Sequence, residues 1–191
     1  MLPFGSALAA LVDALASVGV PWFVAGSVAS VVHGEIRTTQ DVDVVADLQP
    51  AHVPPLAAAL RTTFFVDEIL LMEAVQGGGS CNVIHRETGF KVDLFVLRPR
   101  PFSRVEMDRR QRIELQPGLS LPVASAEDCI LTKLEWFEKG GRVSDRQWRD
   151  VLGILKAQRG ALDTAYLDRW AQELGLGDLM DQAMREATGG P

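Results

Sequence analysis

The segment that most constrains the fold is "DVDVV", residues 41–45, in which two aspartates interrupt an apolar strand pattern. Successive side chains of a strand point to opposite faces, so Asp41 and Asp43 share one face, about 7 Å apart. Val42 and Val44 then point the other way, toward a core. Because aspartate is depleted from strands and costly to bury unpaired, either contact with solvent or a chemical role must compensate.

A third aspartate lies in a similar setting about fifty residues later. Asp93 belongs to "KVDLFVL", where Val92, Leu94 and Phe95 surround it. Three carboxylates that converge from neighbouring strands repel one another unless a multivalent cation lies among them. Oxygen ligands suit Mg²⁺, with Mn²⁺ as an alternative, and paired ions of this kind support displacement at phosphorus. A solvated edge strand is the simpler alternative for Asp41 and Asp43.

The pair Gly26–Ser27 provides a place for phosphate. It lies at the end of the predicted strand "WFVAG" and precedes a predicted helix that runs to about residue 33. Exposed backbone N–H groups at such a junction can bind an anion. Glycine lets a phosphate approach the backbone, and the Ser27 hydroxyl adds a donor.

The composition is that of a globular protein, which we expect to be soluble and cytoplasmic. The net charge of the 191 residues is −6, which argues against broad nonspecific binding of nucleic acid. The first lysine or arginine is Arg37, so the apolar N-terminus lacks the basic segment of a secretory signal. No apolar run approaches the length of a membrane span. Cys81 and Cys129 form no metal-binding or redox motif and fit a reducing compartment.

The hydrophobic spacing divides the chain into an α+β part, residues 1–124, and a helical part, residues 125–191. Strands are predicted at "CNVIH" and "FKVDLFVL", and a hairpin at "RIELQPGLSLPV". Helices are predicted to begin at Ser125 and Ser144, which are good N-caps. We expect three tryptophans to pack in the core of the helical part: Trp136, Trp148 and Trp170.

These motifs resemble the nucleotidyltransferase superfamily of the DNA polymerase β type. The most similar members are the minimal bacterial nucleotidyltransferases that include the AbiEii-type toxins of type IV toxin–antitoxin systems. The likeness covers roughly residues 20–155. It rests on G-[GS], R-x-T-x-D-[IVL]-D, a later aspartate, a helical lysine and a last acidic motif. Here these are Gly26–Ser27, Arg37, Thr39, Asp41, Asp43, Asp93, Lys133, and either Asp145 or Asp150.

The resemblance implies an α+β nucleotidyltransferase fold, a mixed sheet flanked by helices with a C-terminal helical part. It also implies transfer of a nucleoside monophosphate from an NTP to an acceptor. Asp41, Asp43 and Asp93 then bind the metal, and Asp93 can also help to deprotonate the acceptor. The nucleotide is assigned to these residues: Gly26, Ser27, Arg37, Thr39, Lys133, Asp145 and Asp150.

Several alternatives stay open at this point. Arg37 can be an ion-pair partner of the acids, Lys133 a surface lysine, and Asp145 a carboxylate that stabilises the start of a helix. The acceptor can be tRNA, a protein or a small molecule. A non-catalytic nucleotide-binding protein, or one that acts by binding an antitoxin-like partner, would keep the same fold.

Overall fold

The computed structural model describes residues 5–34 and 41–189. Within these, the chain forms two compact units, the first of residues 5–27 and 41–123 and the second of residues 28–34 and 124–189. Residues 28–34 therefore group with the helical unit, which the sequence pattern did not anticipate. The predicted domain boundary between residues 124 and 125 stays a prediction.

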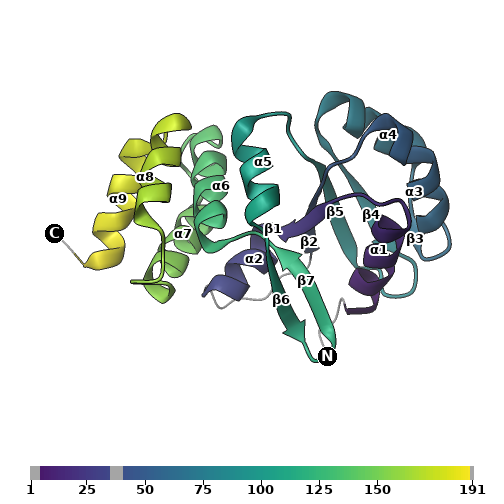
Figure 1. The fold of residues 1–191 in the computed structure, drawn as a ribbon, viewed down its shortest axis with the longest axis horizontal. Helices are drawn as coiled ribbons and strands as arrows, with labels where there is room; N and C mark the ends of the chain where they lie inside the picture. The colour runs from purple at the N-terminus through teal and green to yellow at the C-terminus, as the bar shows by residue number, and fades with distance from the viewer. Residues whose placement is uncertain (1–4, 35–40, 190–191) are drawn as a thin grey trace. The chain divides into compact units, whose positions relative to one another are not determined.

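The first unit is built on a mixed seven-stranded sheet with strand order β3-β4-β5-β2-β1-β7-β6 (Figure 1). The pairs β2–β5 and β1–β7 are parallel, and the other neighbours are antiparallel. The strands are β1 (Trp22–Ala25), β2 (Asp41–Ala46), β3 (Phe64–Phe65), β4 (Ser80–His85), β5 (Lys91–Val96), β6 (Gln111–Gln116) and β7 (Leu119–Val123).

One face of the central strands is packed and the other is partly open. Val42, Val44, Val92 and Leu94 are completely buried, whereas the residues that alternate with them are half-buried. The helices of this unit are α1 (Gly5–Ser17), α3 (Val53–Leu60), α4 (Glu68–Gly77) and α5 (Pro101–Arg109), with a short 3₁₀ turn at Pro50–His52. Helix α3 packs against both α1 and α4, and α4 also contacts β4 and β5.

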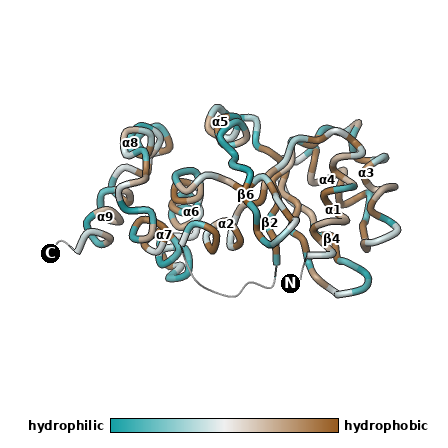
Figure 2. Tube along the Cα trace, turned by 60° about the horizontal axis from the view of Figure 1, so that its bottom comes forward, coloured by the Kyte–Doolittle hydropathy of each residue, from teal (hydrophilic) through white to brown (hydrophobic). Residues whose placement is uncertain are grey.

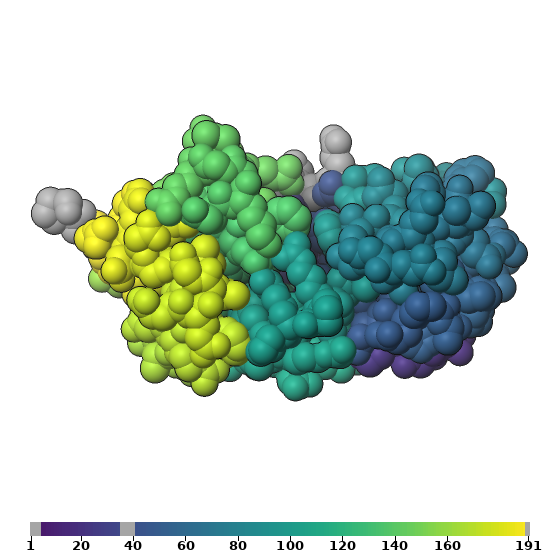
Figure 3. Space-filling view, turned by 90° about the horizontal axis from the view of Figure 1, so that it is seen from above, coloured from purple at the N-terminus to yellow at the C-terminus, as the bar shows by residue number. Residues whose placement is uncertain are grey.

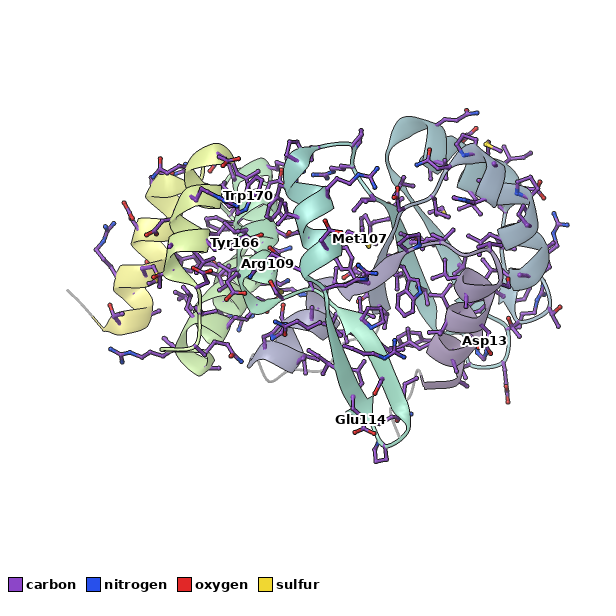
Figure 4. All side chains as sticks on the ribbon, viewed as in Figure 1. Asp13, Met107, Arg109, Glu114, Tyr166 and Trp170 are labelled. Atoms are coloured by element: carbon purple, nitrogen blue, oxygen red, sulfur yellow. The ribbon has the colours of Figure 1, made fainter. Side chains whose placement is uncertain are left out.

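The hairpin at the β6 edge of the sheet is confirmed. Strand β6 (QRIELQ) alternates polar residues with Ile113 and Leu115 and pairs with β7 in antiparallel fashion. Its first residues are hydrophilic (Figure 2). Its turn contains Gly118, whose φ of +81° favours glycine, and the Gly118 N–H donates to Glu114 Oε1 at 2.9 Å. Glu114 lies toward the tip of the hairpin (Figure 4).

The second unit contains α6 (Ala126–Lys139), α7 (Asp145–Ala157), α8 (Thr164–Glu173) and α9 (Gly177–Thr188), together with residues 28–33 of α2 (Gly26–His33). The predicted N-caps are confirmed, since Ser125 Oγ accepts from Asp128 N at 3.2 Å and Ser144 Oγ from Gln147 N at 3.4 Å. His33 Nε2 lies 2.7 Å from the Ala124 carbonyl oxygen. That contact ties the end of α2 to the segment that leads into α6.

The tryptophans of the helical unit do not share one environment. Trp170 is buried, and its ring centroid lies 6.3 Å from that of Tyr166 on the same helix (Figure 4). Trp148 is half-buried and packs on Phe137, with ring centroids 5.1 Å apart. Trp136 is 43% exposed, so its predicted place in the core is wrong.

Helices α3 and α4 contribute to the outer surface of the first unit (Figure 3). Ile69 and Leu70, at the start of α4, are exposed there. Along the described ranges 5–34 and 41–189, every helix is too short or too polar to cross a membrane.

Candidate active site

The three predicted metal ligands lie on one face of the sheet. Asp43 is the direct partner of Asp93 on the adjacent parallel strand, and Asp41 is the partner of Lys91. Partners in register point to the same face, so the four side chains form two adjacent rows. The Asp41 side chain is 33% exposed and the Asp93 side chain 15% exposed. The carboxylates are therefore neither fully solvated nor part of the core.

Gly26 brings the start of α2 against Asp43. Ala25, at the end of β1, is the register partner of Asp43, and the chain turns into the helix at the next residue. Gly26 has a φ of +56°, and a Cβ at this position would lie 1.7 Å from Asp43 Oδ2. The Ser27 N–H donates to the same oxygen at 3.4 Å. Glycine is thus required here both for its backbone angle and for the approach of Asp43.

Lys91 belongs to the site, although it is not part of the motifs that predicted the other site residues. Its Nζ lies 2.7 Å from Asp93 Oδ2 and 3.8 Å from Asp41 Oδ2. The hydrogen bond to Asp93 is the main cause of a raised pKa for Lys91. The sequence "KVD" already indicated that Lys91 lies on the same face as Asp93, because residues two apart on a strand share a face.

The donors at this site fit a hard divalent cation in their chemistry. Carboxylate oxygens are the ligands that Mg²⁺ prefers, and Asp43 and Asp93 face one another across strands about 4.8 Å apart. Within residues 5–34 and 41–189, no three His, Cys, Asp or Glu side chains already converge as a metal-binding group. An ammonium group, that of Lys91, lies against Asp93 instead. Metal binding therefore requires these side chains to rearrange.

Cys81, beside the site on β4, is a poor nucleophile. It is the register partner of Leu94, one residue from Asp93. Burial, together with the charge of Asp93, raises the pKa of the Cys81 thiol to about 11. Because the thiolate is the reactive form, the site chemistry does not run through this cysteine.

The second unit holds another group of predicted site residues. Lys133 Nζ lies 2.7 Å from Asp150 Oδ2 and donates to Gln147 Oε1 at 3.2 Å. Both charged side chains are almost completely buried, so the alternative of Lys133 as a surface lysine is wrong. Asp145 is exposed in the first turn of α7. A carboxylate at this position stabilises the start of a helix, which is the alternative role considered for Asp145.

The structure thus collects the predicted residues in two places. Gly26, Ser27 and the three aspartates 41, 43 and 93 lie together in the first unit. Lys133 and Asp150 are paired in the second unit. Arg37 and Thr39 lie outside the described residues.

The sequence matches no protein-family model and no curated protein. Its fold is similar to that of an antigenic nucleotidyltransferase-like protein from Paracoccidioides brasiliensis, with a TM-score of 0.52 at 16% identity over 93% of this chain and 91% of that one. It is also similar to the lincosamide antibiotic adenylyltransferase LnuA in a lincomycin-bound structure, with a TM-score of 0.51 at 15% identity over 80% and 97% of the two chains. The antibiotic-resistance factor ANT(2'')-Ia gives a TM-score of 0.51 at 11% identity over 87% and 92%.

These likenesses confirm the predicted fold class. The chain has a nucleotidyltransferase fold, with a mixed sheet flanked by helices and a helical C-terminal part. At identities of 11–16% they show the fold alone and do not distinguish the AbiEii-type branch.

Proposed function

We propose that this protein is a metal-dependent nucleotidyltransferase that moves a nucleoside monophosphate from an NTP to an acceptor, with pyrophosphate as the leaving group. The observation that carries the proposal is the register of Asp43 opposite Asp93, with Asp41 on the same face and the Gly26–Ser27 turn against Asp43. Three neighbouring aspartates do not stabilise a packed sheet, because the repulsion between their carboxylates lowers the free energy of unfolding.

In this mechanism Asp41, Asp43 and Asp93 hold Mg²⁺ or Mn²⁺. When bound, the metal would supply positive charge that stabilises the phosphate oxygens during displacement at the α-phosphorus. Asp93 accepts the proton of the attacking hydroxyl, a task that suits a half-buried carboxylate within reach of solvent. Backbone N–H groups at Gly26 and Ser27 bind the outgoing phosphates, for which the Ser27 N–H has to exchange its long hydrogen bond to Asp43 Oδ2.

The nucleotide contacts assigned to Arg37, Thr39, Lys133, Asp145 and Asp150 remain part of the proposal. Lys133 and Asp150 already satisfy one another, so a phosphate ligand has to compete with that ion pair. Membership of the AbiEii-type branch, and with it an antitoxin-like partner, rests on the sequence motifs.

Two observations bear on the acceptor. The net charge of −6 opposes a large tRNA footprint, and therefore favours a small molecule or a protein side chain. LnuA, one of the structures with this fold, is an adenylyltransferase of a small antibiotic.

The decisive experiment combines binding and transfer. Calorimetry with Mn²⁺ and nonhydrolysable NTPs should show nucleotide binding that requires the metal and is lost in Asp43→Asn. Asp13→Asn is the matched control, because Asp13 is exposed on α1 of the same unit (Figure 4). Labelled NTPs incubated with cell RNA, protein and metabolites then identify the fraction that receives label.

Normal metal-dependent binding in Asp43→Asn would refute the metal site. Binding without label transfer to any fraction would instead favour the non-catalytic alternative.

A further inference from the structure

Lys91 stands where a cation is needed at the carboxylate face. It is the register partner of Asp41 and shares a face with Asp93, two residues further along β5. Its Nζ lies 2.7 Å from Asp93 Oδ2 and 3.8 Å from Asp41 Oδ2, so one ammonium group spans two of the three acids.

The contact is directional as well as electrostatic. At 2.7 Å the Lys91–Asp93 pair is a short charge-assisted hydrogen bond, the stronger kind of side-chain contact. The Asp93 side chain is 15% exposed, whereas that of Lys91 is 40% exposed. The carboxylate is therefore held by the sheet, while the lysine has room to withdraw toward solvent.

We infer that Lys91 is a positioning residue that serves as an internal counter-cation for Asp93 and Asp41, and that a divalent metal must displace its ammonium group to bind. The inference rests on the metal site of the proposed function. Lys91 keeps the acids aligned while no metal is bound, and it lowers the metal affinity of the free protein because both cations compete for the Asp93 carboxylate.

The test uses Mn²⁺ alone, measured by electron paramagnetic resonance of the free ion without nucleotide. Lys91→Met keeps the length of the side chain and removes its charge, and we expect it to bind Mn²⁺ about tenfold more tightly. Lys91→Arg restores a cation and should return the affinity toward that of the native protein. If Lys91 only stabilised the strand, its replacement would not raise the affinity of the protein for Mn²⁺.

Lys139→Met is the matched control. Lys139 also pairs with a carboxylate at 2.8 Å, that of Glu135, and its side chain is 48% exposed, but it lies in the second unit. The Mn²⁺ affinity of the Lys139→Met variant should equal that of the native protein. Circular dichroism checks that Lys91→Met is folded, and Lys91→Gln provides a second uncharged variant.

Two negative results can be distinguished. Equal or weaker Mn²⁺ binding in folded Lys91→Met and Lys91→Gln, with native binding intact, overturns the role of Lys91 and leaves the proposed function standing. Absence of Mn²⁺ binding in all proteins, even with a nonhydrolysable NTP, overturns the metal site and the inference with it.

Discussion

The buried ion pair of the second unit allows a quantitative prediction. Lys133 on α6 and Asp150 on α7 lie 2.7 Å apart, with their side chains 6% and 1% exposed. Helices α6 and α7 pack closely along their length, so the pair is enclosed by this contact. Lys133→Met preserves most of the volume and removes only the charge.

The expected cost follows from the burial of the partner. In Lys133→Met the Asp150 carboxylate stays buried and loses the ammonium group that lies 2.7 Å from it. Breaking one side of a buried pair costs about 3–5 kcal/mol of the free energy of unfolding. For a chain of this size that corresponds to a Tm lower by about 6–20 °C. The double variant Lys133→Met/Asp150→Leu should recover much of the loss, because no uncompensated charge remains.

Urea unfolding followed by tryptophan fluorescence measures this effect. Three of the four tryptophans lie in the second unit, so the signal reports mainly on its unfolding. Lys139→Met is the control, since the half-exposed Lys139–Glu135 pair should contribute about 0.3–0.5 kcal/mol. If Lys133→Met and Lys139→Met unfold at the same urea concentration, the pair is not the stabilising contact that its burial implies.

Two further predictions concern the first unit. Gly26→Ala should lose Mn²⁺ binding as well as stability, because the new Cβ displaces the Asp43 carboxylate. The control is Gly78→Ala, at a φ of +63° with open space around it, which should cost only the backbone strain of about 1–2 kcal/mol. Intact metal binding in Gly26→Ala would contradict this prediction. Cys81, with a pKa raised from 9.0 to about 11, should react with iodoacetamide at pH 8 about a hundredfold more slowly than an ordinary thiol. In Asp93→Asn the reaction should be faster, because the charge of Asp93 contributes to the raised pKa. A rate in the native protein equal to that of an ordinary thiol would show that the thiol is not shielded.

The sequence by itself determined the local pattern of this protein. Alternation in "DVDVV" and "KVDLFV" was enough to predict that Asp41, Asp43 and Asp93 leave the packed face of their strands, as they do. The N-caps at Ser125 and Ser144 and the hairpin before them were predictable for the same reason. Each of these features depends on neighbours only a few residues apart, where the periods of strands and helices apply.

The tertiary structure decided which of these residues meet. That Lys91 also reaches Asp41 depends on β5 lying parallel to β2. That Gly26 must be glycine depends on Asp43 lying on the neighbouring strand. The pairing of Lys133 with Asp150 likewise depends on how α6 and α7 pack. Strand order, register and helix packing are set by contacts between residues distant in the sequence. A local pattern can therefore show that a side chain is charged and on one face, but not which partner it meets there.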